Sequence, residues 1–325
     1  MHYISHSMKT LNHKLKIITS IIGLLCLFLS DISFGQSTID TTKIIESSDK
    51  GITVPRKKIY HISYISTSLI IAGGLATDYP AIGRIKNKPS LTSEELASLN
   101  PGVINPLDRW AIHLNPNSYS MYSKLSDNIE PPIFVLLPAM LALDKKIRKD
   151  WFPLFLMYCE GHVITFTFYN YSWFGPTFQN RYRPITYYSQ LSEGTTSSGN
   201  NRNSAYSGHT ASVAFTTFFM AKVYSDYNPD ASKFLLYSAA LIPPVIMGYL
   251  RVLSLAHFPS DCMVGLSIGA AVGVVLPALH KFHCKGIDLG VLAMPGASGL
   301  SMNWTLPHKS INTVQSSAMN LNPLN

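Results

Sequence analysis

Six apolar stretches, each long enough for a helix, follow one another along the chain. They are residues 62–77, 131–143, 151–170, 210–221, 234–250 and 262–279. None of them alternates apolar and polar positions as a half-buried strand does. The pattern therefore predicts an all-α protein, a bundle of five or six helices.

Polar segments flank or separate these stretches. They are residues 37–58, residues 80–128, and residues 189–204, a loop rich in Ser, Thr, Gly and Asn. Within the second segment, Thr92-Ser-Glu-Glu is a capping signal that predicts a short helix over 92–99. Near the C-terminus, residues 287–306 alternate around Pro295-Gly296, which predicts either a small hairpin or a loose tail.

The start of the chain has the layout of an export signal. Three lysines lie within residues 1–16, an uncharged run covers residues 17–30, and small residues follow up to Gln36. Such a short run is typical of a signal peptide, because a membrane-spanning helix needs about 20 residues. We expect a cleaved secretory signal ending near Gly35 or Gln36, or else an uncleaved N-terminal anchor.

Charged residues are scarce. They make up 14% of the 325 residues, against about 25% in soluble domains. The net charge of +8 comes from few acidic residues, and no basic run accompanies a nucleic-acid-binding motif, so a nucleic-acid partner is set aside. The composition indicates a membrane protein or a very apolar helical bundle.

The charge of the connecting segments predicts an orientation in a membrane. Residues 144–150 and 280–285 are both basic, and basic loops stay on the cytoplasmic side. The loops after the third and fifth apolar stretches would then lie outside the cytoplasm. Only residues 262–279 reach the length of a membrane span.

This orientation conflicts with a cleaved signal. The mature N-terminus would start outside, and three spans before residue 180 would leave the following loop inside. Three explanations stay open. Residues 62–77 do not cross, the N-terminal segment is no ordinary export signal, or nothing crosses and the domain is periplasmic.

Three short polar clusters lie at the ends of the apolar stretches. They are Arg181-Tyr-Arg183-Pro184, then Tyr206-Ser207-Gly208-His209, and then Arg251 with His257 and Asp261. Arginine presents a planar fork that matches the oxygens of a phosphate. A helix that starts after Ser207 would add free N–H groups to such an anion site, and Gly208 would let the backbone come close.

The third cluster also carries a candidate nucleophile. If a helix begins near residue 259, Asp261 can orient the imidazole of His257 and raise its basicity. His209 offers a second imidazole as general acid. Two histidines, one carboxylate and several arginines, without a cysteine or acidic cluster, indicate phosphoryl transfer through a phosphohistidine and without a metal.

The three clusters resemble the signature of the type 2 phosphatidic acid phosphatase and vanadium haloperoxidase superfamily. That signature reads Lys-x6-Arg-Pro, Pro-Ser-Gly-His and Ser-Arg-x5-His-x3-Asp. Here Leu250 replaces Ser in the third element, Tyr206 replaces Pro in the second, and Pro176 stands at the Lys position of the first. The resemblance covers about residues 130–280. It implies a helical bundle, often of six transmembrane helices, with the site at the extracytoplasmic face.

The resemblance implies a role for each residue. His257 would attack phosphorus, Asp261 would hold His257, and His209 would protonate the leaving alcohol. The phosphoryl oxygens would be bound by Arg183, Ser207, the Gly208 amide and Arg251. Arg181 is a further phosphate-binding candidate, because its charge could replace that of the missing Lys.

The activity implied is that of a metal-independent phosphatase acting on a lipid phosphate or diphosphate monoester. It would lie in a bacterial inner membrane with its site facing the periplasm. The alternatives are a soluble periplasmic acid phosphatase, a haloperoxidase with vanadate as its cofactor, and a catalytically silent membrane protein that binds an anion. The missing Lys argues against vanadate, which needs more charge compensation than a transient phosphoryl group.

The expected organisation of the chain has five parts. They are a secretory signal or N-terminal anchor (1–36), a polar linker (37–58), an N-terminal helix and polar loop (59–128), a phosphatase-like helical domain (129–284) and a C-terminal tail (285–325).

Overall fold

The computed structural model of the protein describes residues 58–281, 287–294 and 297–304. The expected signal or anchor at residues 1–36 lies outside the described residues, as do the linker up to residue 57 and the tail after residue 304.

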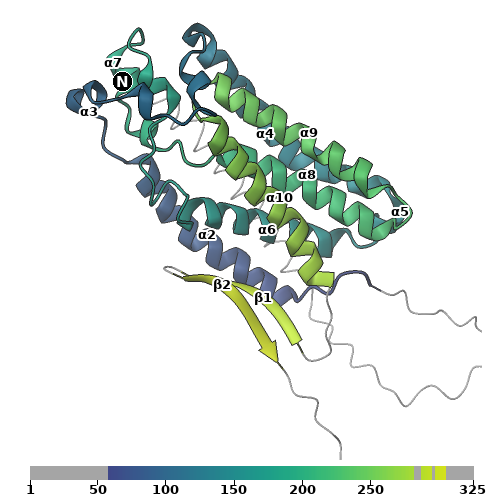
Figure 1. Ribbon diagram of the computed structural model, residues 1–325. Helices are drawn as coiled ribbons and strands as arrows, with labels where there is room; N and C mark the ends of the chain where they lie inside the picture. The colour runs from purple at the N-terminus through teal and green to yellow at the C-terminus, as the bar shows by residue number, and fades with distance from the viewer. Residues whose placement is uncertain (1–57, 282–286, 295–296, 305–325) are drawn as a thin grey trace, which may run out of the picture. The chain divides into compact units, whose positions relative to one another are not determined.

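Six long helices form a bundle (Figure 1). They are α2 (Tyr64–Lys86), α4 (Tyr119–Ala139), α6 (Trp151–Tyr171), α8 (Gly208–Tyr227), α9 (Lys233–Leu253) and α10 (Pro259–Lys281). Each of them contains most or all of one apolar stretch, so the prediction of an all-α bundle is confirmed.

Short helices lie in the connections between the long ones. They are α3 (Ser93–Ala97), α5 (Lys145–Arg148), α7 (Glu193–Thr196) and the 3-10 turns η1 (Pro101–Val103), η2 (Arg109–Ile112), η3 (Pro116–Ser118), η4 (Met140–Leu143), η5 (Pro184–Tyr187) and η6 (Gly199–Arg202). Helix α3 confirms the capping signal, because Thr92 and Glu95 form a reciprocal capping box.

After the bundle, β1 (Ile287–Met294) and β2 (Ala297–Trp304) pair in antiparallel fashion. Ile287 pairs with Trp304, and Met294 pairs with Ala297. The hairpin alternative for this segment is therefore confirmed.

The segment 80–128 is more helical than its polarity predicts. Helix α2 continues to Lys86, and α4 begins at Tyr119 and runs through Pro131 and Pro132. The first turns of α4 carry hydroxyl, amide and carboxylate side chains, so hydropathy does not reveal them. Two of these side chains face the candidate site described below.

Helix α8 lies at the centre of the bundle. Thirteen of its residues are buried, on all of its sides. Its packing against α10 depends on glycines four residues apart on α10. A Cβ atom at Gly269 would lie 2.0 Å from the carbonyl oxygen of Ala211, and one at Gly265 would lie 2.4 Å from that of Ser207. The absence of side chains at these positions lets the two helix backbones approach closely.

The helices around α8 turn apolar side chains outward. On α9, Leu241, Ile242, Val245, Ile246 and Tyr249 are between 41% and 59% exposed. Helices α9 and α10 are both long and apolar enough to cross a membrane. Sequence reasoning found only the second of them, because α9 extends beyond the apolar stretch on both sides.

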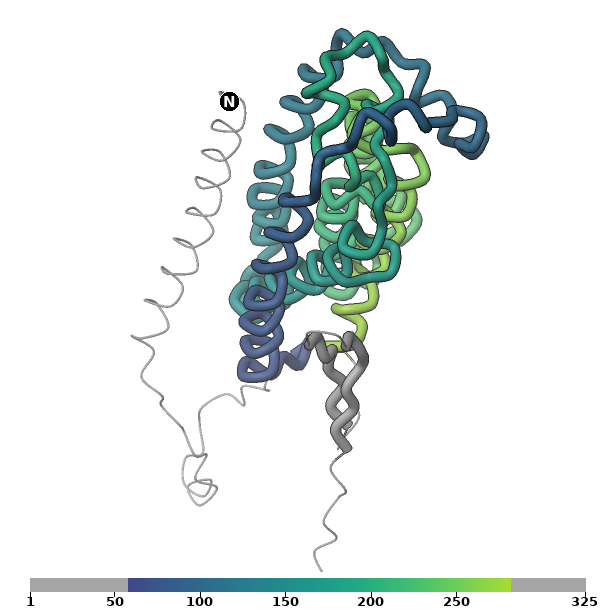
Figure 2. The backbone as a smooth tube through the Cα atoms, turned by 90° about the vertical axis from the view of Figure 1, so that its left-hand side faces the viewer, coloured from purple at the N-terminus to yellow at the C-terminus, as the bar shows by residue number. Residues whose placement is uncertain are grey.

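The bundle has two chemically different ends. Helices α3 and α7 lie at one end and α5 lies at the other (Figure 1). The start of α2 and the end of α10 lie together at the end that carries α5 (Figure 2). There His61 N donates to the His280 carbonyl oxygen at 2.8 Å. Both basic segments meet the last turn of α8. Lys146 Nζ lies 3.2 Å from Asn228 Oδ1, and Lys281 Nζ lies 2.8 Å from Asp226 Oδ1.

Candidate active site

His257 lies in the short connection between α9 and α10, at the end of the bundle opposite the basic segments. Its side chain is buried, and Nδ1 lies 2.6 Å from the main-chain carbonyl oxygen of Ser204. Because a carbonyl can only accept a hydrogen bond, Nδ1 carries the proton and Nε2 carries the lone pair. Burial, together with the charges of Arg183 and Arg251, holds the pKa of His257 well below its usual value. The imidazole is therefore neutral at physiological pH.

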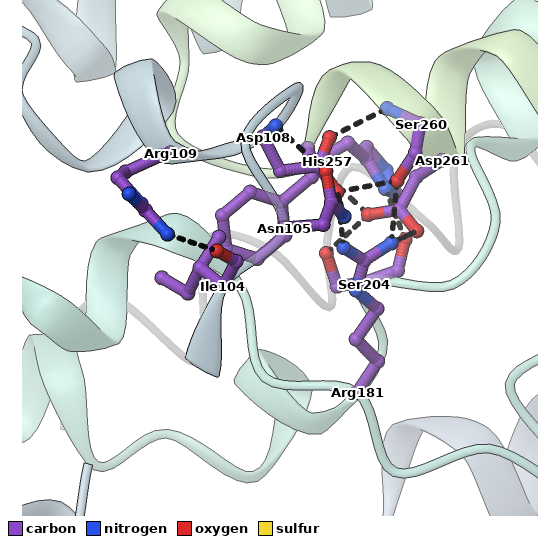
Figure 3. Close-up of polar contacts among 10 residues, drawn as sticks. Ile104, Asn105, Asp108, Arg109, Arg181, Ser204, His257, Ser260 and Asp261 are labelled. Carbon is purple, nitrogen blue, oxygen red and sulfur yellow. Dashed lines mark hydrogen bonds and ion pairs between the residues drawn. The ribbon is translucent and has the colours of Figure 1, made fainter. Parts of the chain in front are cut away.

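Asp261 lies in the first turn of α10, which begins at Pro259. Its Oδ2 atom accepts hydrogen bonds from Phe258 N at 2.9 Å and from Ser204 Oγ at 2.6 Å. Sequence reasoning expected Asp261 to hold His257. In the structure Ser204 stands between them, since its carbonyl accepts from His257 and its hydroxyl donates to Asp261 (Figure 3).

Arg181 is engaged by carboxylates. Its Nη1 atom lies 2.5 Å from Asp261 Oδ1 and 2.9 Å from Ser260 Oγ, and its Nη2 atom lies 2.6 Å from Asp108 Oδ2 (Figure 3). Phosphate binding by Arg181 stays a prediction. Its charge, however, already faces two negative charges.

Asp108 comes from the connection between α3 and α4, just before η2. It is fully buried and also accepts from Ser260 N at 2.8 Å and from Asn105 Nδ2 at 2.5 Å. Burial alone would raise the pKa of Asp108. The hydrogen bonds from Ser260, Arg181 and Asn105 outweigh burial and hold that pKa below its usual value. Asp108 is therefore a buried carboxylate that fixes Arg181 against α10.

Arg183 and Arg251 form the cationic part of the site. Arg183 Nε and Nη2 each lie 3.4 Å from the carbonyl oxygen of Asn203, at the limit of a hydrogen bond. Burial and the neighbouring charge of Arg251 lower the pKa of Arg183 to about 10. Arg251 lies in the last turn of α9. Its Nη1 atom donates to Ser126 Oγ at 2.9 Å, while its buried Nε has no partner among the described residues. Arg251 Nη1 also lies 3.2 Å from Asp127 Oδ1. The half-buried Arg183, with only long hydrogen bonds, and the buried Arg251, with an unpartnered Nε, both suit an oxyanion.

The second cluster forms the start of α8, as predicted. Ser207 is the N-cap, and its Oγ atom accepts from Thr210 Oγ1 at 2.9 Å. A Cβ atom at Gly208 would lie 3.3 Å from the ring of Tyr169, so the backbone there is closely covered. His209 Nε2 lies 3.1 Å from Asp127 Oδ1 and 3.3 Å from Glu130 Oε2.

The structure brings the predicted residues of the three clusters together at one end of the bundle. Arg183, Arg251 and His209 are near enough to lower the pKa of His257 by their charge. The main-chain N–H of Ser207 donates to the Asp261 carbonyl oxygen at 3.1 Å, which joins the second cluster to the third.

Lys88 lies outside the three clusters and contacts the main chain of Pro176, the residue that stands where the motif has lysine. Its Nζ atom lies 2.6 Å from the Pro176 carbonyl oxygen, 2.9 Å from that of Gln179 and 2.8 Å from Asn180 Oδ1. These three acceptors match the three donors of an ammonium group. Burial, with a nearby guanidinium, lowers the pKa of Lys88 to about 8. Lys88 thus holds the loop that precedes Arg181.

Sequence reasoning missed several polar residues of the site. They are Lys88, Asp108, Ser126, Asp127, Glu130 and Ser204. Ser204 lies just before the second cluster, and Asp127 and Glu130 form a carboxylate pair at helical spacing before Pro131. The sequence therefore indicates these three positions only weakly. Lys88 and Asp108 gave none, because they reach the site through long-range folding. No group of three or more His, Cys, Asp and Glu side chains is placed to hold a metal ion among residues 58–281, 287–294 and 297–304.

Comparison with known proteins agrees with the geometry. The model of the PAP2 superfamily matches residues 135–283, a range that includes all three clusters. A search of curated proteins and a search of solved structures gave no match. The resemblance seen in the motifs is confirmed: residues 135–283 of the chain match the PAP2 superfamily.

Proposed function

We propose that the protein is a phosphatase that hydrolyses a lipid phosphate or diphosphate monoester through a phosphohistidine intermediate. Members of the PAP2 superfamily are phosphatases or haloperoxidases. The observation that carries the proposal is a neutral imidazole beside the buried guanidinium of Arg251 and the half-buried guanidinium of Arg183. His257 Nε2 is unprotonated, so its lone pair can attack phosphorus. Arg183 and Arg251 supply positive charge that stabilises the phosphoryl oxygens.

The proposed reaction has two steps. In the first, His257 Nε2 forms a bond to phosphorus, the bond from phosphorus to the leaving oxygen breaks, and His209 gives its proton to that oxygen. In the second, water attacks phosphorus and gives a proton to His209, and the bond between nitrogen and phosphorus breaks to release inorganic phosphate. Arg183 and Arg251 stabilise the charge on the phosphoryl oxygens in both steps. No metal is required.

The surface next to the site supports a lipid substrate. A cavity of about 410 Å³ lies beside Arg181 and Asp261, and its wall includes Trp173, Phe174 and Val264. Trp173 is 75% exposed and Phe174 is 61% exposed. Aromatic side chains of this kind are favoured at the boundary between a membrane and water. An apolar wall beside a polar site suits a molecule with a phosphate head and an apolar chain.

The order of the helices supports a membrane orientation. The six long helices alternate in direction between the two ends, and the basic segments share the end opposite His257. Under the positive-inside rule the site then faces the periplasm. Residue Ser63, before α2, lies at the basic end, which favours the explanation that the N-terminal segment is no ordinary cleaved signal.

The test is phosphate release by the full chain purified in detergent. The substrates are a long-chain phosphatidate, an isoprenyl diphosphate and a soluble aryl phosphate, each with chelator present. We expect release from the lipids, loss of release in His257→Ala, and no loss in His113→Ala, which changes an exposed histidine at the same end. Denaturation with detergent at alkaline pH, which preserves the acid-labile bond between nitrogen and phosphorus, should trap a labelled phosphoprotein in the wild type and His113→Ala but not in His257→Ala.

Two results would overturn the proposal. One is full activity of His257→Ala. The other is bromide oxidation with added vanadate and peroxide, without phosphate release from any substrate, which would establish the haloperoxidase alternative.

A further inference from the structure

A carboxylate of α4 lies between two of the proposed catalytic groups. Asp127 Oδ1 is 3.2 Å from Arg251 Nη1 and 3.1 Å from His209 Nε2. In the proposed reaction Arg251 faces the phosphoryl oxygens and His209 faces the leaving oxygen. One oxygen of Asp127 thus contacts both groups that a bound phosphate ester would contact.

Nε2 of His209 cannot serve Asp127 and a substrate at the same time. An imidazole nitrogen makes one hydrogen bond in the plane of its ring. While Nε2 is directed at Asp127, it cannot donate to the leaving oxygen of a substrate. Arg251 Nη1 is likewise shared between Asp127 and the neutral hydroxyl of Ser126, at 2.9 Å. A phosphate that enters the site therefore competes with the Asp127 carboxylate for these donors.

The Asp127 side chain can move away from the site, whereas the Arg251 side chain is held in place. The Asp127 side chain is 45% exposed, and the Arg251 side chain is 6% exposed. A rotation of the Asp127 side chain toward solvent would keep its charge hydrated. The guanidinium keeps its hydrogen bond to Ser126 when the carboxylate leaves. Glu130 lies one helical turn later on α4 and contacts His209 only, at 3.3 Å.

We propose that Asp127 is a specificity-determining residue that competes with phosphate for the cations of the site. A free phosphate ion must displace the carboxylate with its own charge alone and binds weakly. A substrate with an apolar chain gains binding energy away from the reacting group and uses it to displace Asp127. The identity of that substrate rests on the proposed function, but the competition between Asp127 and an anion does not.

The test is calorimetric titration of inorganic phosphate into the purified full chain, without any substrate. We expect Asp127→Asn to bind phosphate at least about tenfold more tightly than the wild type, because a unit charge next to the anion is removed. Glu130→Gln should give a smaller gain, since it does not contact Arg251. Ser126→Ala removes a hydrogen bond to Arg251 without changing charge and should give no gain. Asp230→Asn, a charge change in the exposed connection between α8 and α9, should leave the affinity unchanged.

Equal or weaker phosphate binding by Asp127→Asn, or no binding by either protein, would overturn the inference. Asp127→Ser takes its place if the amide variant does not fold. Hydrolysis is measured on the same samples, which separates the two proposals. Tighter phosphate binding without any hydrolysis would support the inference while the proposed function fails. Lipid hydrolysis with unchanged phosphate affinity would support the function while the inference fails.

Discussion

Apart from Lys88, which holds the loop before Arg181, the parts of the chain before and after residue 135 contribute mainly opposite charges to the candidate site. After residue 135 come the two histidines and the arginines, all within the range that matches the PAP2 superfamily. Before residue 135 come three of the four carboxylates that contact them: Asp108, Asp127 and Glu130. The fourth, Asp261, belongs to the motif itself. We therefore expect the motif region to attract an anion and the preceding region to adjust how much positive charge the candidate site presents.

The space around individual glycines also differs. Helix α10 approaches α8 so closely that a methyl group at Gly269 would overlap a carbonyl oxygen. Helix α2 also packs closely at Gly74, where a Cβ atom would lie 2.1 Å from Val163 Cγ1, but a methyl group at Gly73 would have no atom within 4 Å.

The largest expected effect comes from removing a cation of the motif region. Arg251→Ala should lower kcat/KM by about 100-fold to 1,000-fold, because a buried charge next to the phosphoryl oxygens is lost. Steady-state hydrolysis of the best lipid substrate measures this. Arg148→Ala, an exposed arginine in α5 at the far end, is the control and should have no effect. Equal losses in the two variants would contradict the assignment.

The next effect concerns a carboxylate of the preceding region. Asp108→Asn should lower the free energy of unfolding by about 2–4 kcal/mol, because it leaves Arg181 and Ser260 with a poorer partner in a buried place. Asp127→Asn makes the same chemical change at a half-exposed position and should cost less than about 1 kcal/mol. Denaturant unfolding in detergent compares the two. Equal costs would show that Asp108 does not hold the two regions together.

A methyl group tests the difference in packing. Gly269→Ala should destabilise the protein by about 1–3 kcal/mol, since α8 and α10 must separate. Gly73→Ala should be neutral or stabilising by up to about 1 kcal/mol, because alanine favours a helix and has room there. Thermal unfolding of both variants checks this, and a loss at Gly73 as large as that at Gly269 would refute the contrast.

The smallest effect is a dependence of stability on pH. The folded protein keeps His257 neutral, whereas the unfolded chain takes up a proton below about pH 6.5. As the pH falls through that value, the free energy of unfolding should decrease by about 1.4 kcal/mol per pH unit from this group. His257→Asn should show a slope smaller by that amount. Unfolding curves between pH 7 and 5 measure the difference, and identical slopes would mean that His257 is protonated in the folded state.

The sequence predicted the helices and the motif residues well, because both depend on short-range patterns. The six apolar stretches are helices, and the start of α10 follows from Pro259. It could not predict Asp108 or Lys88, which meet the motif loops only after the chain has folded back on itself. The spacing of His257 and Asp261 predicted a direct contact between their side chains. Spacing along the chain cannot reveal that Ser204 lies between them.

The burial of α8 has a consequence for how such a chain would enter a bilayer. Among the described helices, α8 is not one of those apolar enough to cross a membrane alone. Its hydroxyl groups are paired with its neighbours: Thr217 Oγ1 donates to the Ala240 carbonyl oxygen of α9 at 2.7 Å, and Thr216 lies 2.9 Å from the Tyr158 hydroxyl of α6. In a membrane, α8 would therefore be inserted together with its neighbours, and the start of the helix, which carries Ser207 and His209, would reach its place only when the surrounding helices are assembled. Assembly of the helices in the membrane would then also complete the candidate site.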